Sequence, residues 1–192
     1  FMYLGRQGAP SLETQTTCYR GVFQAFGDRK VVVRTLDAGA DKPLGFASVG
    51  TDVNPALGMR GLRLQREIPG LLETQLEAIA AASAQSDADV WVMAPMIATV
   101  AEARWFADAA RAAGLQQVGV MVEVPSAALL ADRLLSTCDF ASVGTNDLSQ
   151  YLFAADRLQG RLASLLDAWQ PALWQLTKHA SDAAARAGKP MG

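Results

Sequence analysis

Cysteine, basic charge and long apolar runs are all scarce in this chain of 192 residues. The two cysteines, Cys18 and Cys138, are too few for a disulfide framework and lack zinc-ligand spacing, so we expect reduced thiols. Seventeen lysines and arginines against nineteen aspartates and glutamates leave no basic surplus for binding nucleic acid or an anionic membrane. No apolar run reaches the roughly 18 residues of a spanning helix, and no signal-peptide pattern opens the chain. These absences predict a cytoplasmic protein with neither nucleic-acid partner nor membrane insertion.

The apolar content and the two ends of the chain indicate how it is organised. With 51% apolar residues and no long linker, residues 1–192 are expected to form a single domain. The chain opens on Phe1 and stops at Gly192 without a polar tail. We therefore expect it to be a piece of a longer protein.

Short β-branched runs alternate with longer alanine-rich segments, which is typical of βα units around a parallel sheet. Strands are expected at 31–33, 61–64, 90–93, 118–122 and 140–143. Helices are expected after Pro69 with Leu72, Leu76 and Ile79 on one face, after a Thr99–Glu102 capping box, from Ser126 to near Cys138, and over 170–187 before Gly188. The four tryptophans are expected to be packing residues, and these are Trp91, Trp105, Trp169 and Trp174.

Two architectures fit this order, an open doubly wound sheet and a (β/α)8 barrel. Polar residues follow several expected strands in turn, which favours a barrel, because a barrel gathers functional groups at the carboxyl ends of successive strands. These residues are Arg34, Asp37, Arg60, Arg63, Glu123, Asn146 and Asp147. A closed barrel typically needs about 250 residues. The chain is therefore expected to hold an incomplete barrel.

Two carboxylates follow neighbouring expected strands. Glu123 ends an apolar strand that Pro125 prevents from continuing, and Asp147 follows the next strand after Gly144. Adjacent strands lie about 4.8 Å apart, so the two carboxylates could share one hard cation, for which Mg²⁺ is the natural candidate. The alternative is structural: Glu123 would pair with a neighbouring arginine, and Asp147 would cap the helix that follows it.

Three arginines, Arg34, Arg60 and Arg157, lie at or just beyond expected strand ends. A guanidinium group matches phosphate or carboxylate in a bidentate geometry that lysine cannot provide. Arginines around two carboxylates and a metal suit a small phosphorylated carboxylic acid. Surface salt bridges are the competing interpretation, and for Arg34, directly after the 31–33 strand, we favour ligand binding.

Four ordered motifs, at 34–43, 54–63, 119–125 and 144–151, resemble the phosphoenolpyruvate-binding barrel of Enzyme I of the bacterial sugar phosphotransferase system. The resemblance implies an α/β fold, the (β/α)8 TIM barrel of the phosphoenolpyruvate/pyruvate type, here without its last strands and the start of the first. It implies Mg²⁺ held by Glu123 and Asp147. It also implies that phosphoenolpyruvate or pyruvate is bound by Arg34, Arg60, Asn146, Asp147 and Arg157.

The same resemblance implies phosphoryl transfer to a histidine of a separate upstream domain, then to a histidine-containing phosphocarrier protein, in a full-length homodimer. The family's proton-donor cysteine would lie beyond Gly192, so no catalytic residue is assigned and the chain alone is expected to be inactive. Cys138 is expected in the core and His179 in a helix. Phosphoenolpyruvate synthase and pyruvate phosphate dikinase barrels, and a non-catalytic regulatory barrel, are the alternatives.

Overall fold

The computed structural model describes the chain except residues 1–2, 4–7, 40–43 and 47–51. The chain divides into two compact units. The first unit comprises Phe1–Ala94 and Asp108–Val118, and the second comprises Pro95–Ala107 and Gly119–Gly192. Within the residues that the structure describes, no helix is long and apolar enough to cross a membrane.

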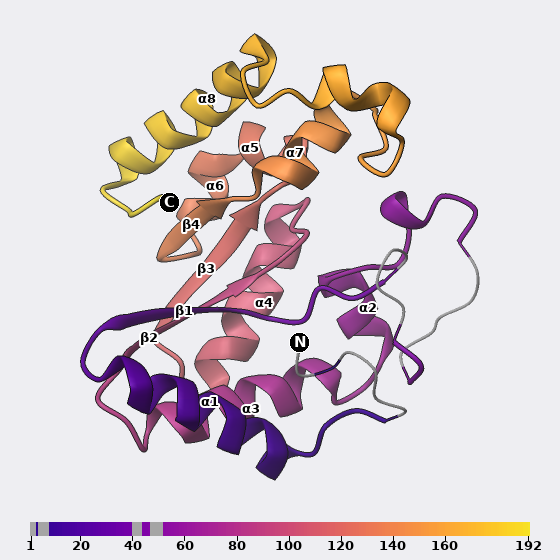
Figure 1. Ribbon diagram of the computed structural model, residues 1–192. Coiled ribbons are helices and arrows are strands. Elements are labelled where there is room, and N and C mark those ends of the chain that lie inside the picture. The colour runs from indigo at the N-terminus through magenta and orange to yellow at the C-terminus, as the bar shows by residue number, and fades with distance from the viewer. Residues whose placement is uncertain (1–2, 4–7, 40–43, 47–51) are drawn as a thin grey trace. The chain divides into compact units, whose positions relative to one another are not determined.

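The first unit joins a parallel strand pair to a helical pair (Figure 1). Strand β1 (Lys30–Arg34) pairs in parallel with β2 (Asp89–Ala94), with Val32 opposite Trp91. Helix α1 (Leu12–Phe26) packs on α3 (Leu71–Ser83), and the short elements η1 (Pro55–Leu57) and α2 (Leu62–Glu67) lie between β1 and α3 in sequence. Phe23 is fully buried, as are Leu72, Leu76 and Ile79, the helix face expected from the sequence.

The second unit holds another parallel strand pair, formed by residues 119–122 and 140–143. Strand β3 (Gln117–Val122) pairs in parallel with β4 (Phe140–Val143), and helix α4 (Val100–Ala112) precedes β3. The last helix, α8 (Pro171–Ala187), packs against three shorter helices and ends at Gly188 in the left-handed conformation. These helices are α5 (Pro125–Leu129), α6 (Ala131–Leu135) and α7 (Thr145–Leu152), and the 3-10 segment η2 (Gly160–Leu166) follows α7.

The expected strands at 31–33, 90–93, 118–122 and 140–143 are confirmed, and so are the α/β class and its parallel pairing. The strand expected at 61–64 is wrong, because residues 62–67 form helix α2. Gly61 precedes this helix at φ 56°, and Leu62, Leu64 and Gln65 are all buried. Four alternating residues are too few to separate a strand from one buried helical turn.

The helix expected from Ser126 to near Cys138 is divided at Leu130 into α5 and α6. Ser126, where the sequence places the start of this helix, does not cap it. Helix α5 starts at Pro125, and the Ser126 hydroxyl instead donates to the backbone oxygen of Ala98 at 2.8 Å. Cys138 is fully buried, as expected for a small core residue.

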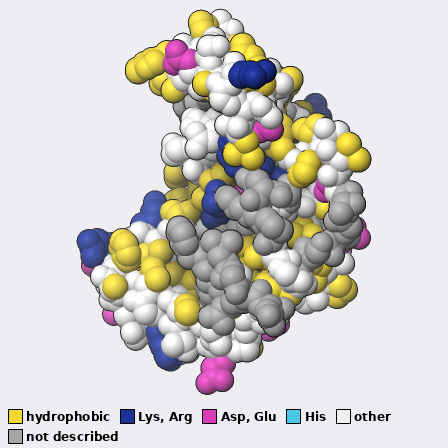
Figure 2. Space-filling view, turned by 45° about the vertical axis from the view of Figure 1, so that its right-hand side comes forward, with side chains coloured by type: hydrophobic (Ala, Val, Ile, Leu, Met, Phe, Trp, Pro, Cys, Tyr) yellow, Lys and Arg dark blue, Asp and Glu magenta, His cyan; other side chains and the backbone are white. Residues whose placement is uncertain are grey.

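Two of the four tryptophans are not packing residues, contrary to expectation. Trp169 is 77% exposed and Trp174 is 53% exposed, and their rings stack with centroids 5.8 Å apart. Helix α8 buries the stripe of Leu173, Ala180 and Ala184, which leaves Trp174 beside that stripe rather than in it. Figure 2 shows apolar side chains at the surface in several places, among polar and charged ones.

Candidate functional site

Glu123 is held at the carboxyl end of β3. It is 1% exposed, and its Oε1 accepts a hydrogen bond from the Met96 backbone N–H at 2.6 Å. Met96 has φ 57°, a conformation that non-glycine residues rarely adopt. The hydrogen bond to a buried carboxylate helps to offset the cost of that backbone conformation.

Gly144 brings the start of α7 against Glu123. The Gly144 N–H donates to the backbone oxygen of Val122 at 3.0 Å. A Cβ at position 144 would lie 2.7 Å from Oε2 and 2.8 Å from Cβ of Glu123. Only glycine permits this close approach, because it has no Cβ.

Asp147 and Arg157 form an ion pair beside this strand end. Asp147 lies in the first turn of α7 and is 7% exposed, and its Oδ2 is 3.2 Å from Nη1 of Arg157. The residue before the helix is Gly144, so Asp147 does not take the capping position that the structural alternative required. A buried carboxylate needs such a counter-charge because burial removes it from water.

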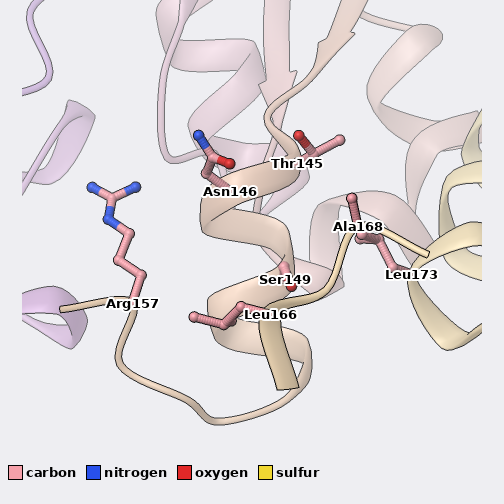
Figure 3. Close-up of a pocket in the computed structure, with 7 residues that line it drawn as sticks. All are labelled: Thr145, Asn146, Ser149, Arg157, Leu166, Ala168 and Leu173. Atoms are coloured by element: carbon pink, nitrogen blue, oxygen red, sulfur yellow. The ribbon is translucent and has the colours of Figure 1, made fainter. Parts of the chain in front are cut away.

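A small cavity lies between α7 and the segment that leads into α8. Its volume is about 100 Å³, and Thr145, Asn146, Ser149, Arg157, Leu166, Ala168 and Leu173 line it (Figure 3). Arg157 extends along α7 toward the turn that carries Asn146. The Ser149 hydroxyl is buried and has no hydrogen-bond partner. The structure therefore brings together Asn146, Asp147 and Arg157, and it places Glu123 against Gly144 just before α7.

The other two expected ligands, Arg34 and Arg60, belong to the first unit. Arg34 ends β1 with its side chain exposed. Arg60 is 2% exposed, and its Nη2 lies 3.0 Å from Oδ2 of Asp37, whose Oδ1 is buried without a hydrogen-bond partner. A Cβ at Gly39 would lie 2.5 Å from Cβ of Arg60, so the chain closes tightly over this arginine. Residues 40–43 of the 34–43 motif lie outside the described residues.

The donor set of the second unit fits a magnesium ion. Mg²⁺ commonly takes one or two protein carboxylates and completes its octahedron with water and substrate oxygens. Glu123 and Asp147 supply two carboxylates, and Oε2 of Glu123 packs against the chain at Gly144, where a side chain would not fit. No group of three or more histidine, cysteine, aspartate or glutamate side chains that could hold a metal occurs in the part of the chain that the structure describes.

Three groups around these residues were not predicted from the sequence. They are the Met96 backbone N–H, the Ser149 hydroxyl and the side chain of Gln150, which accepts from the Arg157 N–H at 3.0 Å. Ser149 and Gln150 stand inside the 144–151 motif, so the motif contained them without distinguishing their roles. Nothing in the sequence around Met96 indicates its left-handed conformation.

An arginine beside carboxylates and an amide near strand ends suits the binding of an anion such as a phosphate or a carboxylate. Over residues 1–192 the chain matches the family described as PEP-utilising enzyme, PEP-binding domain. The chain belongs to this family.

The curated relatives of this chain have a more specific name than the family description. The chain is 53% identical over 185 residues to a phosphoenolpyruvate-protein phosphotransferase of Streptomyces coelicolor, covering 96% of this chain and 33% of the relative. It is 40% identical over 205 residues to the protein of that name from Geobacillus stearothermophilus, covering all of this chain and 35% of the relative. The chain thus spans about a third of the length of these curated relatives.

A solved structure supports the fold alone. An HpcH/HpaI aldolase/citrate lyase family protein from Burkholderia cenocepacia J2315 superposes with a TM-score of 0.50 at 16% sequence identity. The match covers all of this chain and 77% of that structure.

Proposed function

We propose that this chain is the phosphoenolpyruvate- and magnesium-binding part of a phosphoenolpyruvate-protein phosphotransferase. The observation that carries the proposal is the arrangement at the β3 and β4 ends. Glu123 lies against Gly144, and Asp147, one helical turn further on, pairs with Arg157 at 3.2 Å. The printed names of the relatives support the same activity.

In this proposal Glu123 and Asp147 would hold Mg²⁺, which when bound supplies Lewis-acid stabilisation of phosphoryl and enolate oxygens. Arg157 holds phosphoryl oxygens with its guanidinium group, and Asn146 donates an amide hydrogen bond to the same anion. Because these groups are fixed before substrate arrives, they stabilise charge on the phosphoryl group without reorganising during transfer to a histidine. Their motifs support Arg34 and Arg60 as further phosphoenolpyruvate ligands.

Other features of the whole protein belong to the proposal as well. They are a complete (β/α)8 barrel as a single domain, an acceptor histidine outside this chain, a histidine-containing phosphocarrier partner and a homodimer. Support comes from the four motifs and from relatives that are about three times as long as this chain.

The direct test is isothermal titration of phosphoenolpyruvate into the chain with and without Mg²⁺. We expect binding that requires Mg²⁺. Asp147→Ala removes one proposed metal ligand and the partner of Arg157, so we expect it to weaken binding at least about tenfold, as for loss of a charged hydrogen-bond partner.

Asp182→Ala is the matched control, because Asp182 lies on α8 in an exposed ion pair with Lys178 at 2.6 Å. We expect it to bind like the parent. A folded parent chain that binds no phosphoenolpyruvate would contradict the proposed function. Unchanged binding by Asp147→Ala would contradict the assignment of the site.

A further inference from the structure

Arg157 lies in a segment without helix or strand, between α7 and η2. The chain leaves α7 through Ala154, which has φ 50°, and then turns back toward the helix. The Ala155 N–H donates to the backbone oxygen of Gln150 at 3.0 Å, and the Arg157 N–H donates to Oε1 of Gln150 at 3.0 Å. One residue of α7 therefore accepts two hydrogen bonds from this segment.

Gln150 is well placed for this role. It is 5% exposed and lies three residues after Asp147 on α7, so both project from the same side of the helix. Asp147 contacts the guanidinium group of Arg157, whereas Gln150 contacts its backbone N–H. Helix α7 therefore contacts both the backbone N–H and the guanidinium group of Arg157.

Packing alone does not fix the Arg157 side chain, because this side chain is only partly buried. Arg157 borders the cavity of about 100 Å³, and its side chain is 26% exposed. The ion pair with Asp147 holds the guanidinium group and the Gln150 hydrogen bond holds the backbone, so less conformational freedom is lost when this arginine binds an anion.

We infer that Gln150 is a positioning residue for Arg157: its side-chain oxygen fixes the Arg157 backbone so that the guanidinium group is presented beside Asp147. The inference rests on the proposed function, because it assigns Gln150 a role in phosphoenolpyruvate binding without contact to the substrate. Gln150 acts on substrate affinity through Arg157 and leaves the metal ligands Glu123 and Asp147 in place.

The test compares two substitutions that differ in the hydrogen-bond acceptor. Gln150→Met keeps the length of the side chain and removes the acceptor, whereas Gln150→Glu retains an acceptor oxygen. Phosphoenolpyruvate affinity at saturating Mg²⁺ is measured by calorimetry. Metal affinity is measured separately with Mn²⁺ by electron paramagnetic resonance, since carboxylate sites that suit Mg²⁺ also suit Mn²⁺.

We expect Gln150→Met to weaken phosphoenolpyruvate binding about fivefold, as for one lost hydrogen bond, with Mn²⁺ affinity unchanged. Gln150→Glu should recover most of the loss. The matched control is Gln85→Met, because the Gln85 side-chain amide donates an exposed hydrogen bond to the backbone oxygen of Ala81 at 2.9 Å and Gln85 does not line the cavity. This control should bind both ligands like the parent.

Each other outcome has a distinct meaning. If Gln150→Met binds phosphoenolpyruvate like the parent, the inference is wrong and the proposed function stands. If Gln150→Met loses phosphoenolpyruvate and Mn²⁺ equally, Gln150 has only a structural role and the inference is again wrong. If the parent binds Mn²⁺ but not phosphoenolpyruvate, the proposed function fails and the inference fails with it.

Discussion

At the scale of single residues, buried glutamines fix the backbone that follows β1. Gln75 Oε1 accepts from the Leu36 N–H at 2.9 Å, and the side-chain amide of Gln65 donates to the backbone oxygen of Leu36. Gln75 also donates to the Tyr19 hydroxyl at 2.8 Å. Leu36 stands between Arg34 and Asp37, so these polar contacts help to position one expected ligand, Arg34, and the ion-pair partner of another, Arg60.

Replacing Gln75 by leucine should destabilise the chain. The change leaves the Leu36 N–H without its acceptor and the Tyr19 hydroxyl without its donor, in a place where Gln75 is 2% exposed. We expect a loss of about 1 to 3 kcal/mol in the free energy of unfolding, measured by urea denaturation. Gln85→Leu is the control, since Gln85 makes exposed hydrogen bonds. Equal stability of the two variants would contradict the prediction.

At the scale of elements, the start of α4 is fixed by the capping box expected from the sequence. Glu102 Oε2 accepts from the N–H groups of Ala98 and Thr99 at 2.9 and 2.8 Å, and the Glu102 N–H donates to the Thr99 hydroxyl at 3.2 Å. The interactions satisfy backbone donors that the helix cannot pair internally. The capping box also follows directly on the segment that carries Met96, the hydrogen-bond donor to Glu123.

Removing this cap should cost stability. We expect Glu102→Ala to lower the free energy of unfolding by about 1 kcal/mol, a typical value for a lost helix cap, measured by urea denaturation. Glu73→Ala is the matched control, because Glu73 lies in the first turn of α3, where no side chain caps the helix. If both variants lose the same stability, the capping box does not stabilise α4.

At the scale of the whole molecule, alkaline pH should weaken the fold through buried tyrosines. Burial raises the pKa of Tyr19 above its usual value near 10, and burial also raises the pKa of Tyr3. Below pH 10 both tyrosines are neutral whether the chain is folded or not. Above pH 10 the unfolded chain releases these protons first, so the stability that the neutral tyrosines contribute is lost as pH rises.

We therefore expect these two tyrosines to cause no change in the free energy of unfolding near pH 8 to 9. Above about pH 10 we expect the free energy of unfolding to fall as pH rises. Urea denaturation across this range measures it, with tyrosinate absorbance as the direct readout of ionisation. The Tyr3 hydroxyl donates to Oε1 of Gln15 at 2.7 Å. Loss of the Tyr3 proton therefore also breaks a buried hydrogen bond. Ionisation of all three tyrosines of the chain at pH 10 without unfolding would contradict the prediction.

Much of the fold could be predicted because its determinants are local. Apolar β-branched runs located β1 to β4, and the spacing of Leu72, Leu76 and Ile79 located the buried face of α3. The segment at 61–64 was assigned wrongly because four alternating residues fit one helical turn as well as a strand. The exposed stack of Trp169 on Trp174 was also missed, since composition places large aromatic residues inside by default.

The sequence by itself determined that Glu123, Asn146 and Asp147 follow the ends of neighbouring strands, and it predicted that they lie near an arginine. That inference needs only the alternation of strands and the geometry of parallel pairing. Tertiary structure decided the partners: Arg157 for Asp147, Met96 for Glu123 and Gln150 for the Arg157 backbone. Met96 and Glu123 are 27 residues apart in the chain, and Leu36 and Gln75 are 39 apart. Hydropathy periodicity is a local property, whereas a buried hydrogen bond depends on where distant segments meet once the core has packed.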